Sequence, residues 1–599
     1  MSAKTTVLIF CFLILAATGV AALDTLQVIA RLDMSENRLS GQFRHDLPQT
    51  IEMTEYQFQL WANVYTKDTD FLKSVGGMIQ TGTGRPGATR IDSAFLDEQN
   101  ITAYITIENT RGTIALPDKE RLDGRRLRLY FETDIPSFGD RLNVRNGNFL
   151  LSGWFPKPAI LNPDGTWYNP VYGAFCEPIG DFYHFDITLS APDSMVVAFP
   201  AAADERNIGE GLVEYRCHFG PAHDFVMAAA PDYRLDTTGR VRIYYREADL
   251  PILRRLRRTV QTTLDYMERL APYPYDLFTV AVTDAGFWGG IEFPGMIAIS
   301  RPQGGPMVSR YFEVITIHEV IHQWFFGMLA SDQVEHPWMD EAITQYFTNL
   351  IAEAEWGREA NLMDIFGIKI RTRDESRAGA AISRGQEIID QPAYSYIGAS
   401  RYFSTIYSRG SLAVETISNF LGGPVFDSAG SSGAFRFWKR YVDEYKFRRV
   451  VPSDFRRILA ESGGDSVAAV FDLLFTTPDE IDIAVADLQN TRIDSVTAGV
   501  SFELSLTGRL RWPIPYRLFY SDGDSLDGVR KITYNTERVS LELDRPVRTV
   551  IVDPENLFAI DADLMNNSVQ LDTDSRPATR LSSGLMFLLE SLMSLVGGI

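Results

Sequence analysis

The sequence predicts a multidomain protein in which an N-terminal antiparallel β domain, a mostly helical α/β domain and a small C-terminal β-sandwich domain follow one another. The chain has 599 residues, more than a single hydrophobic core usually serves. Apolar and polar residues alternate over much of 23–236 and again over 481–569, whereas helical periodicity dominates between them. We therefore expect domains at 23–238, 239–478 and 479–574, with a short helical tail at 575–599.

The N-terminal β domain is predicted from short alternating runs that Gly, Pro, Asn and Asp residues separate. Tyr56–Trp61 and Phe182–Leu189 are typical examples. A period of two residues places alternate side chains on opposite faces of a strand, so these runs favour antiparallel sheets with one buried face.

The middle domain begins with a strand at Val241–Arg246 and a helix from Pro251 to about Leu270, which Pro272 and Pro274 follow. Further helices are expected at 312–328 and, after the breaker Pro337, from Glu341 to about Trp356. The helix at 312–328 is apolar on most sides, which indicates a buried helix.

The C-terminal β domain is predicted from alternation at Ser501–Leu506 and Arg548–Val552. The tail after it carries Leu585, Leu589 and Val596 at helical spacing. Glu590 and the short length argue against a membrane span, so we expect a helix that docks on the protein. Contact with a membrane surface is the alternative, although the segment lacks a basic face.

The first 22 residues resemble a secretory signal. Lys4 supplies a positive charge, residues 7–17 are apolar, and Val20–Ala22 offers small residues for cleavage after Ala22. We expect an exported protein, periplasmic or extracellular, with an uncleaved anchor as the alternative. The remaining cysteines, Cys176 and Cys217, are compatible with one disulfide or with two buried thiols.

The charge balance excludes one class of partner. With 57 basic and 78 acidic residues, the chain has a net charge of −21. Such a surface repels phosphate backbones, so we expect no nucleic-acid partner.

The motif His318-Glu319-Val320-Ile321-His322, followed after eighteen residues by Glu341, predicts a catalytic zinc site. Histidines at i and i+4 lie on one face of a helix and can share one Zn²⁺. With Glu341 they fill three tetrahedral positions and leave the fourth for water or substrate, whereas a structural site closes all four, usually with thiolates. Glu319 is placed to act as general base on the zinc-activated water.

Four sequence blocks resemble the gluzincin zinc aminopeptidases, the family of aminopeptidase N and leukotriene-A hydrolase. They are residues 318–327 (HEVIHQWFFG), 338–346 (WMDEAITQY), 289–294 (GGIEFP) and 407–410 (YSRG). Their order and spacing fit the family, whose exopeptidase motif is usually G-[AG]-M-E-N and whose tyrosine motif is Y-x-K-G. The resemblance covers nearly the whole mature chain and implies a thermolysin-like catalytic domain with one zinc ion per chain.

The resemblance also implies residue roles. Glu292 matches the glutamate that binds the α-ammonium of a peptide, which fixes the cut one residue from the end. Gly289 and Gly290 would let the backbone approach the substrate closely. Tyr407 matches the tyrosine whose hydroxyl stabilises the oxyanion. The implied partners are therefore peptides with a free N-terminus.

Several residues depart from the family pattern. Ile291 and Phe293 replace the usual Met and Asn beside the ammonium site, Asp340 stands for Asn, and Arg409 stands for Lys. We expect these changes to affect substrate preference. No pattern in the N-terminal domain identifies the second amine-anchoring Glu or Gln that the family carries.

Two alternatives accompany the aminopeptidase prediction. A related zinc hydrolase could act on a non-peptide substrate, as relatives with epoxide chemistry do. A non-catalytic zinc-containing binding protein is the second alternative, although such a site needs neither Glu319 nor Tyr407.

Overall fold

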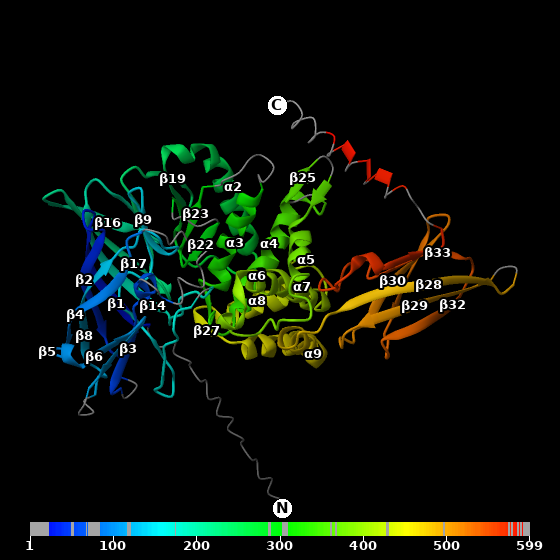
Figure 1. Ribbon diagram of the computed structural model, residues 1–599, viewed down its shortest axis with the longest axis horizontal. Helices are drawn as coiled ribbons and strands as arrows, with labels where there is room; N and C mark the ends of the chain where they lie inside the picture. Colours follow the sequence, from blue (N-terminus) through cyan, green and yellow to red (C-terminus); the bar gives the residue numbers. More distant parts are fainter. Residues whose placement is uncertain are drawn as a thin grey trace, which may run out of the picture.

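The computed structural model has three parts in a row, as Figure 1 shows in blue to cyan, green to yellow and orange. It describes residues 23–572 with gaps at 50–52, 67–68, 70–83, 117–120, 174, 285–288, 302–309, 360–361, 366–367, 427–429 and 495–496, and scattered residues of 576–590. The predicted signal peptide and most of the predicted tail lie outside the described residues. The multidomain fold class is confirmed.

The N-terminal part is built on a sheet of eight described strands in the order β16-β17-β14-β1-β2-β8-β4-β5. These strands are β16 (Ala203–Gly209), β17 (Leu212–Ala222), β14 (Tyr183–Pro192), β1 (Thr25–Asp33), β2 (Arg38–Asp46), β8 (Arg126–Asp134), β4 (Ala88–Leu96) and β5 (Gln99–Asn100). The sheet is antiparallel except that β1 and β14 run parallel. Alternation of buried and open residues along β1 gives the sheet its apolar face, as predicted.

In the described part of the chain, two four-stranded sheets and a two-stranded sheet of β12 (Ile160–Leu161) and β13 (Trp167–Tyr168) accompany the eight-stranded sheet. One four-stranded sheet has the order β11-β3-β7-β6 and the other β15-β18-β10-β9. The strands are β11 (Lys157–Pro158), β3 (Glu55–Gln59), β7 (Arg111–Ala115), β6 (Ile105–Glu108), β15 (Val196–Ala198), β18 (Met227–Ala230), β10 (Asn148–Leu151) and β9 (Leu142–Arg145). Cys176 and Cys217 are both buried and are not joined by a disulfide.

The middle part combines a five-stranded sheet of order β19-β20-β21-β23-β22 with the helices. The strands are β19 (Arg234–Thr238), β20 (Val241–Tyr245), β21 (Phe278–Thr283), β23 (Met296–Ser300) and β22 (Gly290–Phe293). β19 pairs with β20, so this sheet begins before the expected boundary at 238/239. Alternation continues across the boundary, and a local pattern therefore does not reveal which sheet a strand joins.

The helices of the middle part begin and end close to the predicted positions. The helix expected at 312–328 is α3 (Tyr311–Phe325), and the helix expected from Glu341 is α4 (Glu341–Trp356). The other helices are α2 (Leu250–Met267), α5 (Thr372–Ala380), α6 (Gly398–Phe403), α7 (Ser411–Phe420), α8 (Gly433–Tyr445) and α9 (Pro452–Thr476). Of the described helices, none is long and apolar enough to cross a bilayer.

The C-terminal part contains two sheets, β28-β29-β32 and β31-β30-β33-β34, and β28 contacts both β33 and β34. The strands are β28 (Asp482–Arg492), β29 (Ala498–Thr507), β32 (Thr536–Leu543), β31 (Ser525–Arg530), β30 (Ile514–Tyr520), β33 (Val547–Val552) and β34 (Ser568–Gln570). Inward side chains of the two sheets share one core, as a sandwich requires.

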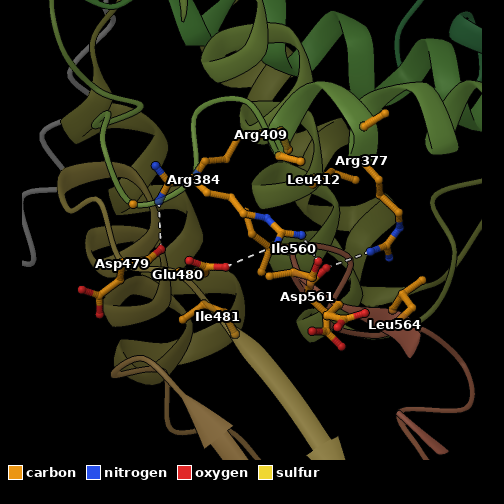
Figure 2. Close-up of a pocket in the computed structure, with 16 residues that line it drawn as sticks. Arg377, Arg384, Arg409, Leu412, Asp479, Glu480, Ile481, Ile560, Asp561 and Leu564 are labelled. Carbon is orange, nitrogen blue, oxygen red and sulfur yellow. Dashed lines mark hydrogen bonds and ion pairs between the residues drawn. The ribbon is translucent and has the colours of Figure 1, made fainter. Parts of the chain in front are cut away.

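Arginines join the C-terminal part to the helices, around a cavity of about 280 Å³. Arg377 donates to the carbonyl of Asp561 at 2.9 Å, and Arg384 donates to the carbonyl of Ala562. Figure 2 shows these side chains extending toward the chain around Asp479 and Asp561. The described lining of this cavity includes none of the predicted metal ligands, so it is separate from the candidate site.

Candidate metal centre and active site

Helices α3 and α4 bring the three predicted metal ligands together. His318 and His322 lie one turn apart on α3, with ring centroids 4.7 Å apart. Glu341 is the first residue of α4, after the turn Pro337–Met339, and faces both rings. The apolar sides of the two helices are buried in the core, which fixes the helices against each other.

The spacing of the donor atoms fits a tetrahedral zinc ion. Glu341 Oε2 lies 3.1 Å from His318 Nε2 and 3.4 Å from His322 Nε2. Ligands bound at the usual zinc distances of about 2.0–2.2 Å are separated by about 3.3–3.6 Å along a tetrahedral edge. His322 Nε2 is also a buried nitrogen without a hydrogen-bond partner among the described residues. The donor set and its geometry therefore suit one Zn²⁺.

Polar neighbours orient the two imidazoles. Nδ1 of His322 lies 2.5 Å from Asp340 Oδ1, and Nδ1 of His318 lies 3.4 Å from the Thr348 hydroxyl. Contacts at Nδ1 leave Nε2 for the metal and set the ring orientation. Asp340, which the sequence marks only as a departure from the family, thus supports a ligand directly.

Glu319 projects from α3 beside this centre and is almost fully buried. Burial raises the pKa of Glu319 well above its usual range, and the neighbouring Glu292 carboxylate adds to this effect. Gly290 of β22 leaves room for the Glu319 side chain, because a Cβ atom at position 290 would lie 2.2 Å from Cγ of Glu319. Position 290 therefore requires glycine because a side chain there would collide with Glu319. Gly289 instead has φ +122°, a region that favours glycine.

Strand β22 places Glu292 next to Glu319. Oxygen atoms of these two acids and a nitrogen of His322 all lie within 4.8 Å of one another. Gln323 of α3 fixes the strand, because its amide donates to the carbonyl of Phe293 at 2.9 Å and accepts from the amide of Gly295 at 2.8 Å. One helix thus carries the histidines and holds the strand that carries Glu292.

Two residues of the site were not predicted from the sequence. Glu177 and Arg141 both come from the N-terminal part and pair with each other, and Glu177 is buried. The Arg141 guanidinium also lies 3.9 Å from Glu292 Oε1. Each residue lies in an irregular segment between strands, where no periodic or motif signal marks it.

Tyr407 lies on a π-helical turn, Ser404–Gly410, a distortion that is frequent at functional sites. Its ring stacks on that of His318, with centroids 5.7 Å apart. Burial raises the pKa of Tyr407 well above its usual range, and the Glu341 carboxylate adds to this effect. The hydroxyl therefore keeps its proton. The hydroxyl is therefore a neutral donor beside the metal ligands.

Arg409 contacts the chain segment that joins the middle part to the C-terminal part. It donates to the carbonyls of Thr477 and Asp479 at 3.2 and 3.0 Å, on the chain that leads into the C-terminal part. Its planar fork reaches more than one carbonyl, which a lysine ammonium does less well. The replacement of Lys by Arg at position 409 therefore affects the contact between the middle part and the C-terminal part.

Ile291 and Phe293 are both buried in a second apolar cluster with residues of β10, β18, β21 and β23. Alternation along β22 places both on the opposite side of the strand from Glu292, although the Phe293 ring still lies 5.9 Å from the guanidinium carbon of Arg141. Their expected effect on substrate choice stays a prediction.

Comparisons with known proteins identify a domain in the middle part of the chain. Residues 258–473 match the peptidase family M1 domain. The middle part of the chain therefore contains a peptidase family M1 domain. It is 24% identical to aminopeptidase M1-B of Oryza sativa subsp. japonica over 157 residues, which cover 26% of this chain and 16% of that protein. The M1 family is that of the gluzincin aminopeptidases, so the resemblance inferred from the four sequence blocks is confirmed.

Two solved structures share the fold of this chain. Aminopeptidase A of Legionella pneumophila, crystallised with aspartic acid, superposes with a TM-score of 0.62 at 10% identity, covering 90% of this chain and 59% of that one. The M1 zinc metallopeptidase of Deinococcus radiodurans gives 0.52 at 15% identity, covering 76% and 94%. The curated relatives are matched over only 15% to 32% of their lengths.

Proposed function

We propose that this chain is a zinc-dependent aminopeptidase that removes N-terminal residues from peptides. The observation that carries the proposal is a group of buried carboxylates beside the metal ligands. Glu292 Oε1, Glu319 Oε2 and Glu177 Oε2 are buried and have no hydrogen-bond partner among the described residues. Buried carboxylate oxygens without donors are costly, so a ligand that brings a positive charge and several N–H groups is favoured there.

The α-ammonium of a peptide is such a ligand. Glu292 and Glu177 would accept its hydrogen bonds and pair with its charge. An amine held there places the first peptide bond, and no later one, at the metal ligands. The acids would thereby define an exopeptidase and exclude substrates with a blocked N-terminus.

His318, His322 and Glu341 would hold the zinc ion. When bound there, zinc acts as a Lewis acid that polarises the scissile carbonyl and makes water nucleophilic near neutral pH. Glu319 would take the proton from the attacking water and pass it to the leaving amine. Its raised pKa suits the first step, because a carboxylate that binds the proton more tightly is the stronger base.

Tyr407 would act on the carbonyl oxygen. Its hydroxyl keeps its proton and can donate a hydrogen bond that strengthens as negative charge develops on that oxygen. Export is part of the same proposal and rests on the apolar segment at 7–17 with Lys4 before it.

A substrate panel tests this function. The purified full chain should release a coumarin fluorophore from unblocked aminoacyl derivatives of Ala, Leu, Arg, Glu and Phe, and the panel should identify the preferred residue. A chelator should abolish the release, and added zinc should restore it. The matched N-acetylated substrates should not react. Equal cleavage of acetylated and free substrates would contradict the exopeptidase assignment, and zinc-loaded protein that cleaves none of them would favour the binding-protein alternative.

A further inference from the structure

Arg141 brings a positive charge from the N-terminal part into the carboxylate group of the site. It precedes β9 and its backbone N–H donates to Asp140 Oδ1 at 3.0 Å. Its side chain is 13% exposed, and its guanidinium contacts Glu177 and lies 3.9 Å from Glu292 Oε1. No part of the proposed reaction so far uses this residue.

The surroundings of Arg141 leave part of its hydrogen-bonding capacity unused. Its Nη1 is buried without a hydrogen-bond partner among the described residues. The carbon centre of the guanidinium lies 5.9 Å from the centre of the Phe293 ring. Phe293 stands at the position where the family usually has Asn, and its ring offers the guanidinium no carbonyl oxygen as an acceptor. The charge of Arg141 is therefore directed to the two glutamates.

The charges of these three residues match one ammonium. Glu177 and Glu292 together carry two negative charges in a buried site, and side-chain exposures of 9% and 6% leave little water to screen them. Arg141 offsets one of the two charges. The remaining single charge equals that of one α-ammonium, so a bound amine leaves no uncompensated charge among these three residues.

We propose that Arg141 is a positioning residue that holds Glu177 and sets the amine subsite to one net negative charge. This inference rests on the proposed aminopeptidase function and deepens it. It has a consequence that a purely structural role lacks. When Glu177 loses its charge, Arg141 is left with Glu292 and competes with the substrate ammonium for it. Removing Arg141 as well frees Glu292 again.

A double-mutant cycle on ligand binding tests this competition. Binding of leucinamide to the zinc-loaded full chain is measured by calorimetry for the wild type, Glu177→Gln, Arg141→Gln and the double variant, with N-acetyl-leucinamide as the matched control ligand. Glu177→Gln should weaken leucinamide binding by about 30-fold in the wild-type background but by less than about threefold in the Arg141→Gln background. Because Arg141 no longer competes for Glu292 in the double variant, this variant should bind leucinamide more tightly than Glu177→Gln alone.

Other results would overturn the inference. A double variant that binds no better than Glu177→Gln would show that Arg141 does not compete for Glu292. Arg141→Lys keeps the positive charge, so a Glu177→Gln effect that disappears in the Lys background would also contradict the inference. Thermal melts of each variant confirm that it is folded. If the wild type binds leucinamide and its acetylated form equally, the proposed function itself fails. If the wild type binds only leucinamide, but the double variant does not regain leucinamide affinity relative to Glu177→Gln, only the role of Arg141 is rejected.

Discussion

Asp340 Oδ1 lies 2.5 Å from Nδ1 of His322, and this contact directs Nε2 of the same ring toward Glu341. Asp340 is fully buried, and its second oxygen accepts a hydrogen bond from Gln333. The carboxylate is thus fixed from both sides, and the ring orientation of a metal ligand depends on it.

Changes at Asp340 should therefore weaken the metal site in a graded way. Asp340→Asn keeps an oxygen for the Nδ1 proton but loses the charge, so zinc affinity should fall by about tenfold. Asp340→Ala removes the acceptor and should cost about 100-fold. Competition with a fluorescent chelator measures both values. Asp443→Asn is a matched control because Asp443 pairs with Lys439 on the surface of α8. Zinc affinity unchanged in the alanine variant would contradict the orienting role.

Glu319→Gln should abolish turnover while the metal stays bound. The amide has a similar shape but cannot accept the proton of the attacking water, so kcat should fall by about 10³-fold. Zinc content and leucinamide binding should stay close to wild type. Glu313→Gln is the control on the same helix, because Glu313 pairs with Arg255 at 2.5 Å and is not part of the carboxylate group at the metal centre. A Glu319→Gln variant with full activity would remove Glu319 from the mechanism.

Tyr407→Phe should lower kcat and leave KM nearly unchanged. Phenylalanine keeps the stacking on His318 but lacks the donor for the developing oxyanion, whose loss costs about 100-fold. Steady-state kinetics on the preferred aminoacyl substrate separates the two constants. Tyr396→Phe serves as the control, because the Tyr396 hydroxyl donates to backbone carbonyls of Ile388 and Ile389. If both variants retain wild-type kcat, the oxyanion role of Tyr407 is wrong.

The arrangement of the three predicted metal ligands follows from the sequence because their geometry is local. His318 and His322 are fixed relative to each other by one helix, and α4 begins at Glu341 as the breaker at Pro337 indicates. Helical spacing therefore determines most of the ligand arrangement, and the sequence motif already contains it.

The rest of the amine subsite depends on contacts that no local pattern contains. Glu177 and Arg141 reach Glu292 only because the N-terminal part packs against the middle part. Each comes from an irregular segment, and the period of two along the neighbouring strands says nothing about where such a segment lies. The same limitation explains β19, whose alternating sequence fits either sheet.

The C-terminal part should show a pH-dependent stability that Asp561 controls. Burial raises the pKa of Asp561 to about 7, although the carboxylate accepts hydrogen bonds from Asn567 Nδ2 at 2.7 Å and from the amide of Ile483 at 3.2 Å. Its pKa in the folded chain lies above that of an unfolded aspartate, about 3.9. The folded state then binds the proton more tightly, so the stabilisation is present at low pH and is lost as the pH rises through about 7.

Asp561→Asn should remove this dependence, because an amide stays neutral while keeping an oxygen for the Ile483 amide. From pH 5 to pH 8.5 the wild type should lose on the order of 1–3 kcal/mol relative to the variant. Thermal melts at both pH values give the Tm of the variant minus the Tm of the wild type. This Tm difference should be larger at pH 8.5 than at pH 5. The exposed Asp544 provides the control, since Asp544→Asn should give a difference that does not vary with pH. A Tm difference for Asp561→Asn that is equally independent of pH would mean that Asp561 is ionised in the folded chain throughout this range.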